Sequence, residues 1–319
     1  MPEESSQKQT WEREVLENVL LASIAEQRQA RRWGIFFKSL VFIYLFMIFI
    51  VVVEPFSPTS IAKGKAHTAV VNVIGTISEG SDSDAGRIIK GLRAAAEDKG
   101  TKGIILRMNT PGGTPVQAAY VYDEIKRIKQ QKPDLPIYAV VSDMCASGGY
   151  YIAAAADKIF VSQASLIGSI GVIMNGFGFV DAMNKLGVER RLLIAGTHKA
   201  ILDPFSPVSS EEKAHVQTLL NRVHQQFIEA VRRGRGERLR DDDPDIFSGL
   251  VWTGGESIKL GLADAFGSTD SVARDVIGAE EIVDFTQEEG VIDRLAGRLG
   301  TSFGHALLGA VKAAGLSLQ

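Results

Sequence analysis

Strands and helices alternate regularly along the middle of the sequence, and this pattern constrains the fold more than any other feature. Short runs rich in β-branched residues take turns with segments of helical spacing. The predicted strands are 69–77, 103–109, 136–143 and 158–162, and the predicted helices are 84–100, 115–131 and 146–156. Strands that alternate with helices of this length are joined by parallel crossovers. The sequence therefore predicts an α/β domain built on a parallel sheet.

The pattern becomes mostly helical beyond the predicted strands. Ser209 or Ser210 is placed to cap a long helix there, with help from Glu212. We expect one domain over residues 67–285, with repeated β-α-β units followed by this helical part. Residues 286–319 form a glycine- and alanine-rich tail with weak helical spacing, to which we assign no role.

A long apolar stretch lies near the N-terminus. Residues 40–53 carry no charge and no helix breaker, and extending the stretch back to Ile35 adds only Lys38 and Ser39 as polar residues. At ~1.5 Å per residue, residues 35–53 just span a hydrocarbon core of ~30 Å. We expect one transmembrane helix there, retained as a signal-anchor.

Two other interpretations of this stretch are weaker. A buried core helix would show a polar face, and residues 40–53 show none. A cleaved signal peptide would begin earlier and end at a site of small residues, which residues 54–66 do not offer convincingly. With Pro55 and Pro58, residues 54–66 are instead expected to be a tether between membrane and domain.

The positive charges that flank the apolar stretch indicate its orientation. More basic residues precede the span than follow it: Arg28, Arg31, Arg32 and Lys38, against Lys63 and Lys65. Basic flanks stay on the cytoplasmic side of a membrane. We therefore expect residues 1–34 to be cytoplasmic and the domain to face the periplasm, with the protein in a bacterial inner membrane.

Composition argues against several partners and cofactors. A formal net charge of −3 gives no reason to expect nucleic acid as a partner. The arginine-rich run 232–240 is followed directly by Asp241, Asp242 and Asp243, so we interpret it as a solvated helix end. Cys145 is the one cysteine in the sequence, which rules out an intramolecular disulfide and a cysteine-based zinc site. We expect no metal and no other cofactor.

Two glycine-rich segments follow predicted strands and suit acyl chemistry. Residues 109–113 (NTPGG) come after one strand, and paired glycines there let the backbone present an N–H with no side chain in the way. Such a donor is what an oxyanion hole needs. Residues 146–150 (ASGGY) come after the next strand and place Ser147 where a helix opens.

Each segment also has a simpler interpretation. Residues 109–113 would serve as an ordinary loop that needs glycine, and Ser147 as an N-cap residue without catalytic function. Together they place a nucleophile beside two oxyanion donors at the carboxyl ends of strands, where α/β sheets usually carry their sites.

A nucleophilic serine needs a base, and the residues alone leave two candidates. His198 is the one histidine in a loop of suitable character, and Lys199 follows it directly. A lysine base must be neutral, whereas a lysine in water titrates near ~10.4, so the amine has to be desolvated. Sequence physics does not choose between the two.

The motifs together resemble the S49 signal peptide peptidases, in their short bacterial form, within the ClpP/crotonase superfamily. The resemblance covers residues 68–270 and is carried by NTPGG at 109–113, ASGGYY at 146–151, IGSIGV at 167–172, GTHKAILDPFSP at 196–207 and GGESIKLGLADAFG at 254–267. It implies a Ser/Lys dyad of Ser147 and Lys199, with Ser169 holding the lysine amine. It also implies backbone oxyanion donors at Gly113 and Gly148. One departure is threonine in place of the serine of the family's SPGG motif.

The same resemblance implies an activity and a partner. The expected enzyme is a membrane-anchored serine endopeptidase that degrades cleaved signal peptides and other extended apolar peptides through an acyl-enzyme. Longer relatives hold two tandem halves, whereas this chain holds one, so a homo-oligomeric ring is expected. Two alternatives are a crotonase-like acyl-CoA enzyme and a non-catalytic membrane scaffold that keeps the fold.

Overall fold

The computed structural model describes four stretches of the chain, which fall into two units. The described residues are 26–29, 31–49, 65–240 and 242–287. Residues up to Ser57 belong to the first unit, and Pro58–Glu289 form the second. The predicted tether, except its last two residues, most of the predicted cytoplasmic segment and most of the C-terminal tail lie outside the described residues.

The first unit contains an apolar helix, Glu26–Phe49. It is 24 residues long with a mean hydropathy of 1.6, and none of its apolar window is buried. Within the described residues it is the one helix long and apolar enough to cross a membrane. Near its start Trp33 stacks on Phe37, with ring centroids 5.7 Å apart. The helix overlaps most of the predicted span 35–53.

The second unit is built on an eight-stranded sheet. Its strands are β1 (His67–Ile74), β2 (Thr101–Thr110), β3 (Ile137–Ala146), β4 (Lys158–Val161), β5 (Leu166–Gly168), β6 (Val251–Thr253), β7 (Ala265–Phe266) and β8 (Ile282–Asp284). The order is β6-β5-β3-β2-β1-β8, and β4 pairs with β3 and β7. All pairs are parallel except β5 with β6. The predicted α/β class is confirmed.

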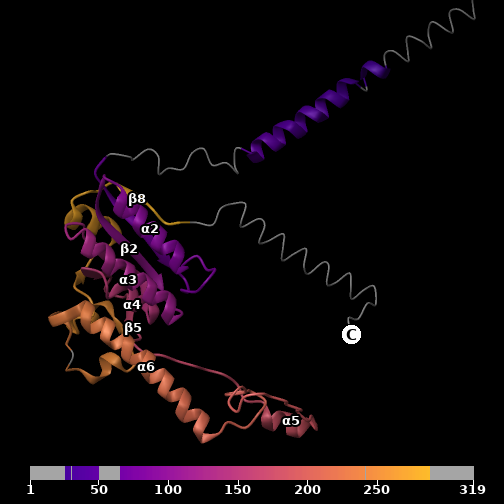
Figure 1. Ribbon diagram of the computed structural model, residues 1–319. Coiled ribbons are helices and arrows are strands. Elements are labelled where there is room, and N and C mark those ends of the chain that lie inside the picture. Colours follow the sequence, from indigo (N-terminus) through magenta and orange to yellow (C-terminus); the bar gives the residue numbers. More distant parts are fainter. Residues whose placement is uncertain (1–25, 30, 50–64, 241, 288–319) are drawn as a thin grey trace, which may run out of the picture. The chain divides into compact units, whose positions relative to one another are not determined.

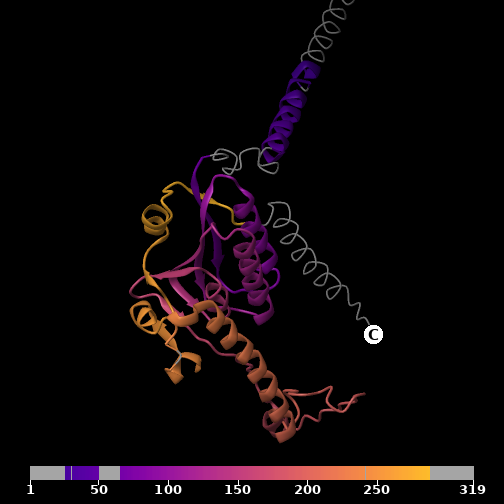
Figure 2. The same cartoon turned by 60° about the vertical axis from the view of Figure 1, so that its left-hand side comes forward.

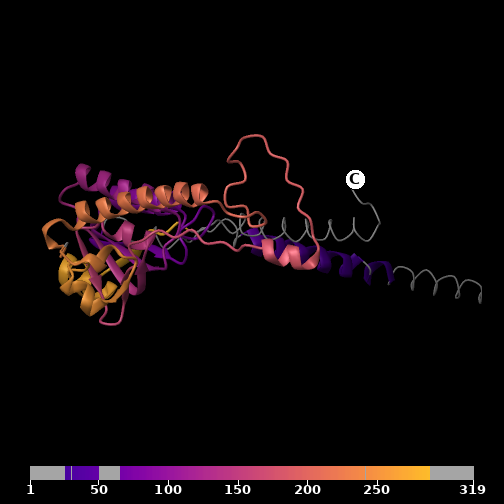
Figure 3. The ribbon, with the colours of Figure 1, turned by 90° about the horizontal axis from the view of Figure 1, so that it is seen from below.

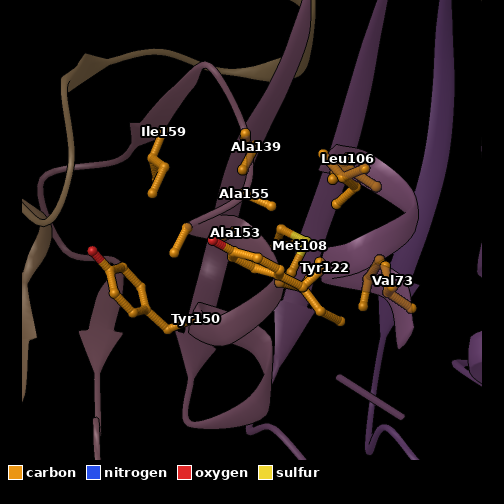
Figure 4. Close-up of a cluster of buried hydrophobic side chains, with 14 of the residues drawn as sticks. Val73, Leu106, Met108, Tyr122, Ala139, Tyr150, Ala153, Ala155 and Ile159 are labelled. Carbon is orange, nitrogen blue, oxygen red and sulfur yellow. The ribbon is translucent and has the colours of Figure 1, made fainter. Parts of the chain in front are cut away.

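The second unit also contains helices, most of which pack on the sheet and enclose its main core. They are α2 (Ala85–Glu97), α3 (Pro115–Gln131), α4 (Gly148–Ala153), α5 (Val180–Leu186), α6 (Ser210–Arg235), α7 (Gly254–Lys259) and α8 (Thr269–Ser271), with short turns η2 (Gly236–Arg238), η3 (Pro244–Phe247) and η4 (Val272–Ile277). Alternate residues of β1 to β3 pack against α2, α3 and α4, and Leu106, Met108 and Tyr150 are completely buried there. Figure 4 shows this core between strands and helices.

Local sequence explains how the helices begin. Asp84 caps α2 by accepting a hydrogen bond from the Gly86 N–H at 2.7 Å. Ser209 caps α6 in a capping box with Glu212, as predicted, because each side chain accepts the other's backbone N–H. Pro115 begins α3, where a missing N–H costs nothing.

The prediction of a mostly helical C-terminal part was incomplete. Strands β6, β7 and β8 lie there, and β5 also lies in a segment that received no assignment. Each has three residues or fewer, too short to show an alternating pattern. These strands form because a neighbour in the sheet supplies their hydrogen bonds, which no local pattern reveals.

Residues 172–209 form an extended arm that carries α5. None of these residues is buried, and α5 itself has no buried residue. The 26-residue helix α6 begins at the end of the arm and runs back to the sheet. Figures 1, 2 and 3 agree that α5 lies beyond the end of α6 that is remote from the sheet.

Candidate active site

Ser147 sits in a strained turn between β3 and α4. Its backbone has φ 52° and ψ −124°, a region that costs a non-glycine residue about 1–3 kcal/mol. The turn is held on both sides, because the Ser147 N–H donates to the Gly168 carbonyl at 2.8 Å and the Tyr151 N–H donates to the Ser147 carbonyl at 3.0 Å. The Ser147 side chain makes no capping hydrogen bond. Ser147 therefore occupies the N-cap position of α4 without the side-chain hydrogen bond that a capping serine would make.

The predicted oxyanion segment lies directly against this turn. A Cβ placed on Gly112, whose φ is +103°, would come within 2.7 Å of the Ser147 Cβ. A Cβ placed on Gly148 would come within 3.2 Å of the Gly113 backbone nitrogen. The two glycine-rich segments therefore touch, and glycine is required for the close approach at Gly112.

The N–H groups of Gly113 and Gly148 are both available as donors. Gly113 forms a parallel bridge with Ile77, in which the Thr114 N–H donates to the Ile77 carbonyl and the Ile77 N–H donates to the Gly112 carbonyl, each at 2.9 Å. In such a bridge the N–H of Gly113 itself points away from Ile77. Gly148 is the first residue of α4, so its N–H has no intrahelical acceptor.

A cavity of about 330 Å³ opens beside Ser147 and these two glycines. Its wall consists mostly of apolar and aromatic side chains from α3, α4, α6 and the start of the arm. They include Val116, Ala119, Tyr120, Tyr151, Val172, Ile173, Val223 and Phe227. Tyr151 and Phe227 pack on each other with ring centroids 5.0 Å apart. This wall was not predicted from the sequence, where its signal was the three- and four-residue spacing of these side chains along α3 and α6.

Ser169 lies beside Ser147 at the same edge of the sheet. Ala146 pairs with Gly168 in the parallel register of β3 and β5, so the two serines follow paired residues. Ser169 also has a positive φ of 52°, and its N–H donates to the Leu250 carbonyl at 2.7 Å. A positive φ at both positions holds two hydroxyl-bearing residues in fixed turns at neighbouring strand ends.

Lys199 and His198 lie elsewhere, in the arm. Both side chains are exposed, and neither residue lines the cavity beside Ser147. A turn holds the backbone here, with the Lys199 N–H donating to the Gly196 carbonyl at 3.0 Å. Of the residues predicted for the site, this protomer thus brings together all but Lys199.

Other groups near the nucleophile are unsuited to its role. Cys145 is completely buried, and this burial raises the pKa of its thiol far above the ordinary value. Burial also raises the pKa of the Tyr151 hydroxyl. No group of three or more histidine, cysteine or acidic side chains in the described stretches could hold a metal ion. Ser147 is partly exposed and lines the cavity, so it remains the candidate nucleophile.

Comparison with protein families places this site in a known group. Residues 129–281 match the family described as peptidase family S49, and residues 67–167 match the family described as Clp protease. Residues 129–281, just under half of the chain, are thus similar to peptidase family S49. The two matches include the Ser147 turn, both glycine-rich segments, the arm and α6, so the resemblance found in the sequence is confirmed.

Three named proteins are similar to part of this chain. One from Enterococcus faecium, named as a signal peptide peptidase SppA, is 32% identical over 195 residues, which are 61% of this chain and 56% of the relative. Protease 4 of Haemophilus influenzae is 32% identical over 229 residues, covering 70% of this chain and 36% of that protein. The Na(+)/H(+) antiporter NhaA of Brucella abortus is 38% identical over 216 residues, covering 67% of this chain and 29% of that protein. The chain therefore spans 29% to 56% of the length of these relatives.

Proposed function

We propose that this protein is a serine endopeptidase with Ser147 as its nucleophile. One observation carries the proposal. Ser147 is held in a strained turn at a cavity, with an uncapped side chain and with the N–H groups of Gly113 and Gly148 beside it. A nucleophile placed next to preorganised backbone donors is the arrangement that stabilises the oxyanion of acyl transfer.

The reaction transfers an acyl group to Ser147 and then to water. Lys199, neutral before the reaction, takes the hydroxyl proton as Oγ attacks the scissile carbonyl carbon, and the oxyanion accepts hydrogen bonds from Gly113 and Gly148. Lys199 returns the proton to the leaving amine as the peptide bond breaks. Lys199 then takes a proton from water as the water attacks the acyl-enzyme. The ester bond breaks, the acid product leaves, and the proton returns to the Ser147 oxygen. Ser169 holds the lysine amine toward the nucleophile.

The base reaches Ser147 from a second copy of the chain. Lys199 sits in the exposed arm and does not itself line the cavity of its own chain. The arm also exposes large apolar side chains, with Ile173 and Phe177 each 83% exposed and Leu193 97% exposed. Such a surface marks a protein contact, and a neighbouring protomer would both cover it and receive Lys199. We therefore propose a homo-oligomeric ring.

Cleaved signal peptides and other extended apolar peptides are the proposed substrates. The cavity beside Ser147 has a largely apolar wall, which suits an apolar side chain next to the scissile bond. The name of the Enterococcus faecium relative agrees with this class. Helix Glu26–Phe49 would anchor the domain beside substrates in a bacterial inner membrane, with residues 1–34 cytoplasmic and the domain periplasmic. A reporter active only in the periplasm, fused to the C-terminus, would be silent if the topology were the reverse.

Peptidase activity on an apolar fluorogenic peptide tests the proposal. We expect Ser147→Ala and Lys199→Ala to abolish turnover and His198→Ala to retain it, with the circular dichroism spectrum unchanged in each. A fluorophosphonate probe should label the parent and fail to label Ser147→Ala. Turnover that survives in Lys199→Ala and disappears in His198→Ala would move the base to histidine. An inactive, unlabelled parent in its assembled state would favour the non-catalytic scaffold.

The other candidate functions have less support. An acyl-CoA enzyme would share the fold and the glycine donors but would need neither the arm lysine nor an apolar N-terminal helix. The antiporter name belongs to a protein of which this chain matches 29%, and the described residues contain one candidate membrane-spanning helix. Neither alternative accounts for the strained turn at Ser147.

A further inference from the structure

The loop that carries Lys199 is tied down by a compact set of contacts within the arm. Arg190 and Asp203 form an ion pair with Nη1 and Oδ1 3.1 Å apart, and the Asp203 side chain is only 10% exposed. The Ser206 hydroxyl donates to the other oxygen of the same carboxylate at 2.6 Å. Asp203 thus joins two points of the arm that are distant in sequence, in a region where no residue is buried.

Consecutive turns connect this carboxylate to the lysine. The Lys199 N–H donates to the Gly196 carbonyl, the Asp203 N–H donates to the Ala200 carbonyl, each at 3.0 Å, and the Ser206 N–H donates to the Asp203 carbonyl at 3.2 Å. A chain of short turns leaves few alternative backbone paths between Lys199 and Asp203. Fixing Asp203 therefore fixes the lysine's backbone.

Aromatic contacts secure the other side of the loop. Phe205 stacks on Phe179 with ring centroids 5.4 Å apart, and the Arg190 guanidinium lies over the Phe205 ring at 5.4 Å. The Phe179 N–H also donates to the Pro204 carbonyl at 2.7 Å, just before α5 begins. Arg190 therefore contacts the loop twice, through charge and through the ring face.

We infer that Arg190, Asp203 and Ser206 position Lys199, holding its loop in one conformation before it meets the nucleophile of another protomer. This inference rests on the proposed role of Lys199 as the base. The physical reason is preorganisation. An exposed loop would otherwise lose conformational entropy at every docking event, and a base displaced by about 1 Å can cost about a hundredfold in rate. None of the three residues lines the cavity beside Ser147 in its own chain.

The arm supplies a matched control for this ion pair. Arg191 and Glu189 also pair at 3.1 Å, but their side chains are 84% and 73% exposed and contact nothing in the Lys199 loop. Arg191→Gln removes one positive charge from the arm, as Arg190→Gln does, without releasing the loop. An effect seen for Arg190 and not for the control is then caused by the loss of contacts with the Lys199 loop and not by the change in charge.

The experiment compares Arg190→Gln, Asp203→Asn, the double variant and the control Arg191→Gln in the full-length, detergent-solubilised protein. We expect each single variant to lower kcat about 10- to 100-fold with KM changed less than about twofold. The double variant should be no worse than the poorer single variant, because the two residues act as one unit. Asp203→Glu, which keeps the charge, should recover part of kcat, and Arg191→Gln should match the parent.

Light scattering and a Lys199→Ala sample separate the outcomes. Variants of the pair should keep the mass of the parent assembly. If Lys199→Ala is inactive while Asp203→Asn keeps full kcat, the positioning role is wrong and the proposed function stands. A loss of kcat together with loss of assembly would make the pair an assembly contact and would also overturn the inference. If Lys199→Ala keeps full activity, the proposed base itself fails.

Discussion

At the scale of single residues, close backbone approach gives the site its chemistry. Gly113 has no room for a side chain, because a Cβ there would lie 2.6 Å from the Ile77 carbonyl carbon and 2.7 Å from the Ile77 nitrogen. Gly148 is less crowded, with 3.2 Å to the Gly113 nitrogen and 3.4 Å to the Ala118 Cβ. The two donors therefore respond differently to the same added methyl group.

Alanine substitution should separate the two donors. Gly113→Ala forces the segment away from Ile77 and moves its N–H, so we expect kcat to fall about 100-fold or more. In Gly148→Ala the neighbouring atoms need to move only slightly to make room for the methyl group. We therefore expect a smaller loss of kcat, about tenfold or less. Steady-state kinetics on the same peptide checks both. Equal activity of the two variants would mean that Gly113 is not held by the bridge to Ile77.

A buried carboxylate links α2 to α3 and should make stability depend on pH. Glu124 is 6% exposed and accepts from Arg93 through Nε and Nη2, each at 2.9 Å, and from Arg127. The hydrogen bonds from Arg93 have the largest effect on the pKa of Glu124. Together with those from Arg127 they lower it to about 2. In an unfolded chain a glutamate titrates near ~4.3, so the stabilisation is present above that pH and is lost as pH falls toward 2.

Glu124→Gln should remove this pH dependence. We expect it to lower the free energy of unfolding by about 2 kcal/mol at neutral pH, a figure discounted because both arginines are about half exposed. The difference from the parent should shrink as pH falls from about 5 to 2. Denaturant titrations at several pH values measure this, with Glu237→Gln, an exposed carboxylate, as the control. A difference that persists at about pH 2 would contradict the assignment.

At the scale of elements, α6 connects the arm to the sheet and is fastened at one end. Arg235 at its last turn has a fully buried side chain, which pairs with Asp264 through Nη1 at 2.8 Å and Nη2 at 2.9 Å. Its Nε also donates to the Gly261 carbonyl at 2.8 Å. Although burial opposes the effect, hydrogen bonds from Arg235 contribute to a lowered pKa for Asp264. This end of α6 is thereby held beside β7.

Arg235 and Arg238 both contact Asp264, so substituting each in turn measures how much each pair contributes to stability. Arg235→Ala leaves the carboxylate of Asp264 without its buried partner, and we expect the free energy of unfolding to fall by about 3 kcal/mol. Arg238 contacts the same carboxylate at 3.1 Å but is 39% exposed, so Arg238→Ala should cost about 1 kcal/mol or less. Chemical denaturation measures the free energy of unfolding of both variants. If Arg235→Ala and Arg238→Ala lowered it by similar amounts, burial would not explain a difference between the two ion pairs.

At the scale of the whole molecule, one protomer presents an incomplete site. Ser147, Ser169, Gly113 and Gly148 meet at the sheet edge, whereas Lys199 projects in the arm. The apolar side chains of the arm, such as Leu193 and Phe177, remain exposed in the single chain. In the proposed ring, a neighbouring chain would cover these side chains and bring Lys199, the proposed base, to Ser147.

Mixed assemblies test this directly. Ser147→Ala and Lys199→Ala should each be inactive alone. Co-expressed with different tags and purified as hybrids, they should recover about a quarter of parent activity, because random neighbours place an intact serine beside an intact lysine at about that frequency. Hybrids with no activity, in a sample whose mass matches the parent assembly, would show that serine and lysine must come from one chain.

Features that depend on near neighbours in the chain could be predicted from the sequence. The alternation of strands and helices predicted the α/β class, the Ser209 and Glu212 spacing predicted the cap of α6, and the motifs at 109–113 and 146–150 located the proposed nucleophile and its donors. Periodicity, capping and turn chemistry depend on residues a few positions apart, so they can be recognised from the sequence.

Features that depend on contacts between distant segments could be seen only in the folded chain. Strands β5 to β8 exist through pairing with distant segments, and the cavity wall combines α3 with α6. Gly113 and Gly148 became neighbours because β2 and β3 pair in parallel register. The separation of Lys199 from Ser147 within one chain depends on the direction in which the arm, residues 172–209, extends from the sheet. Contacts between residues far apart in the chain are set by packing, and packing leaves no local pattern for a single sequence to display.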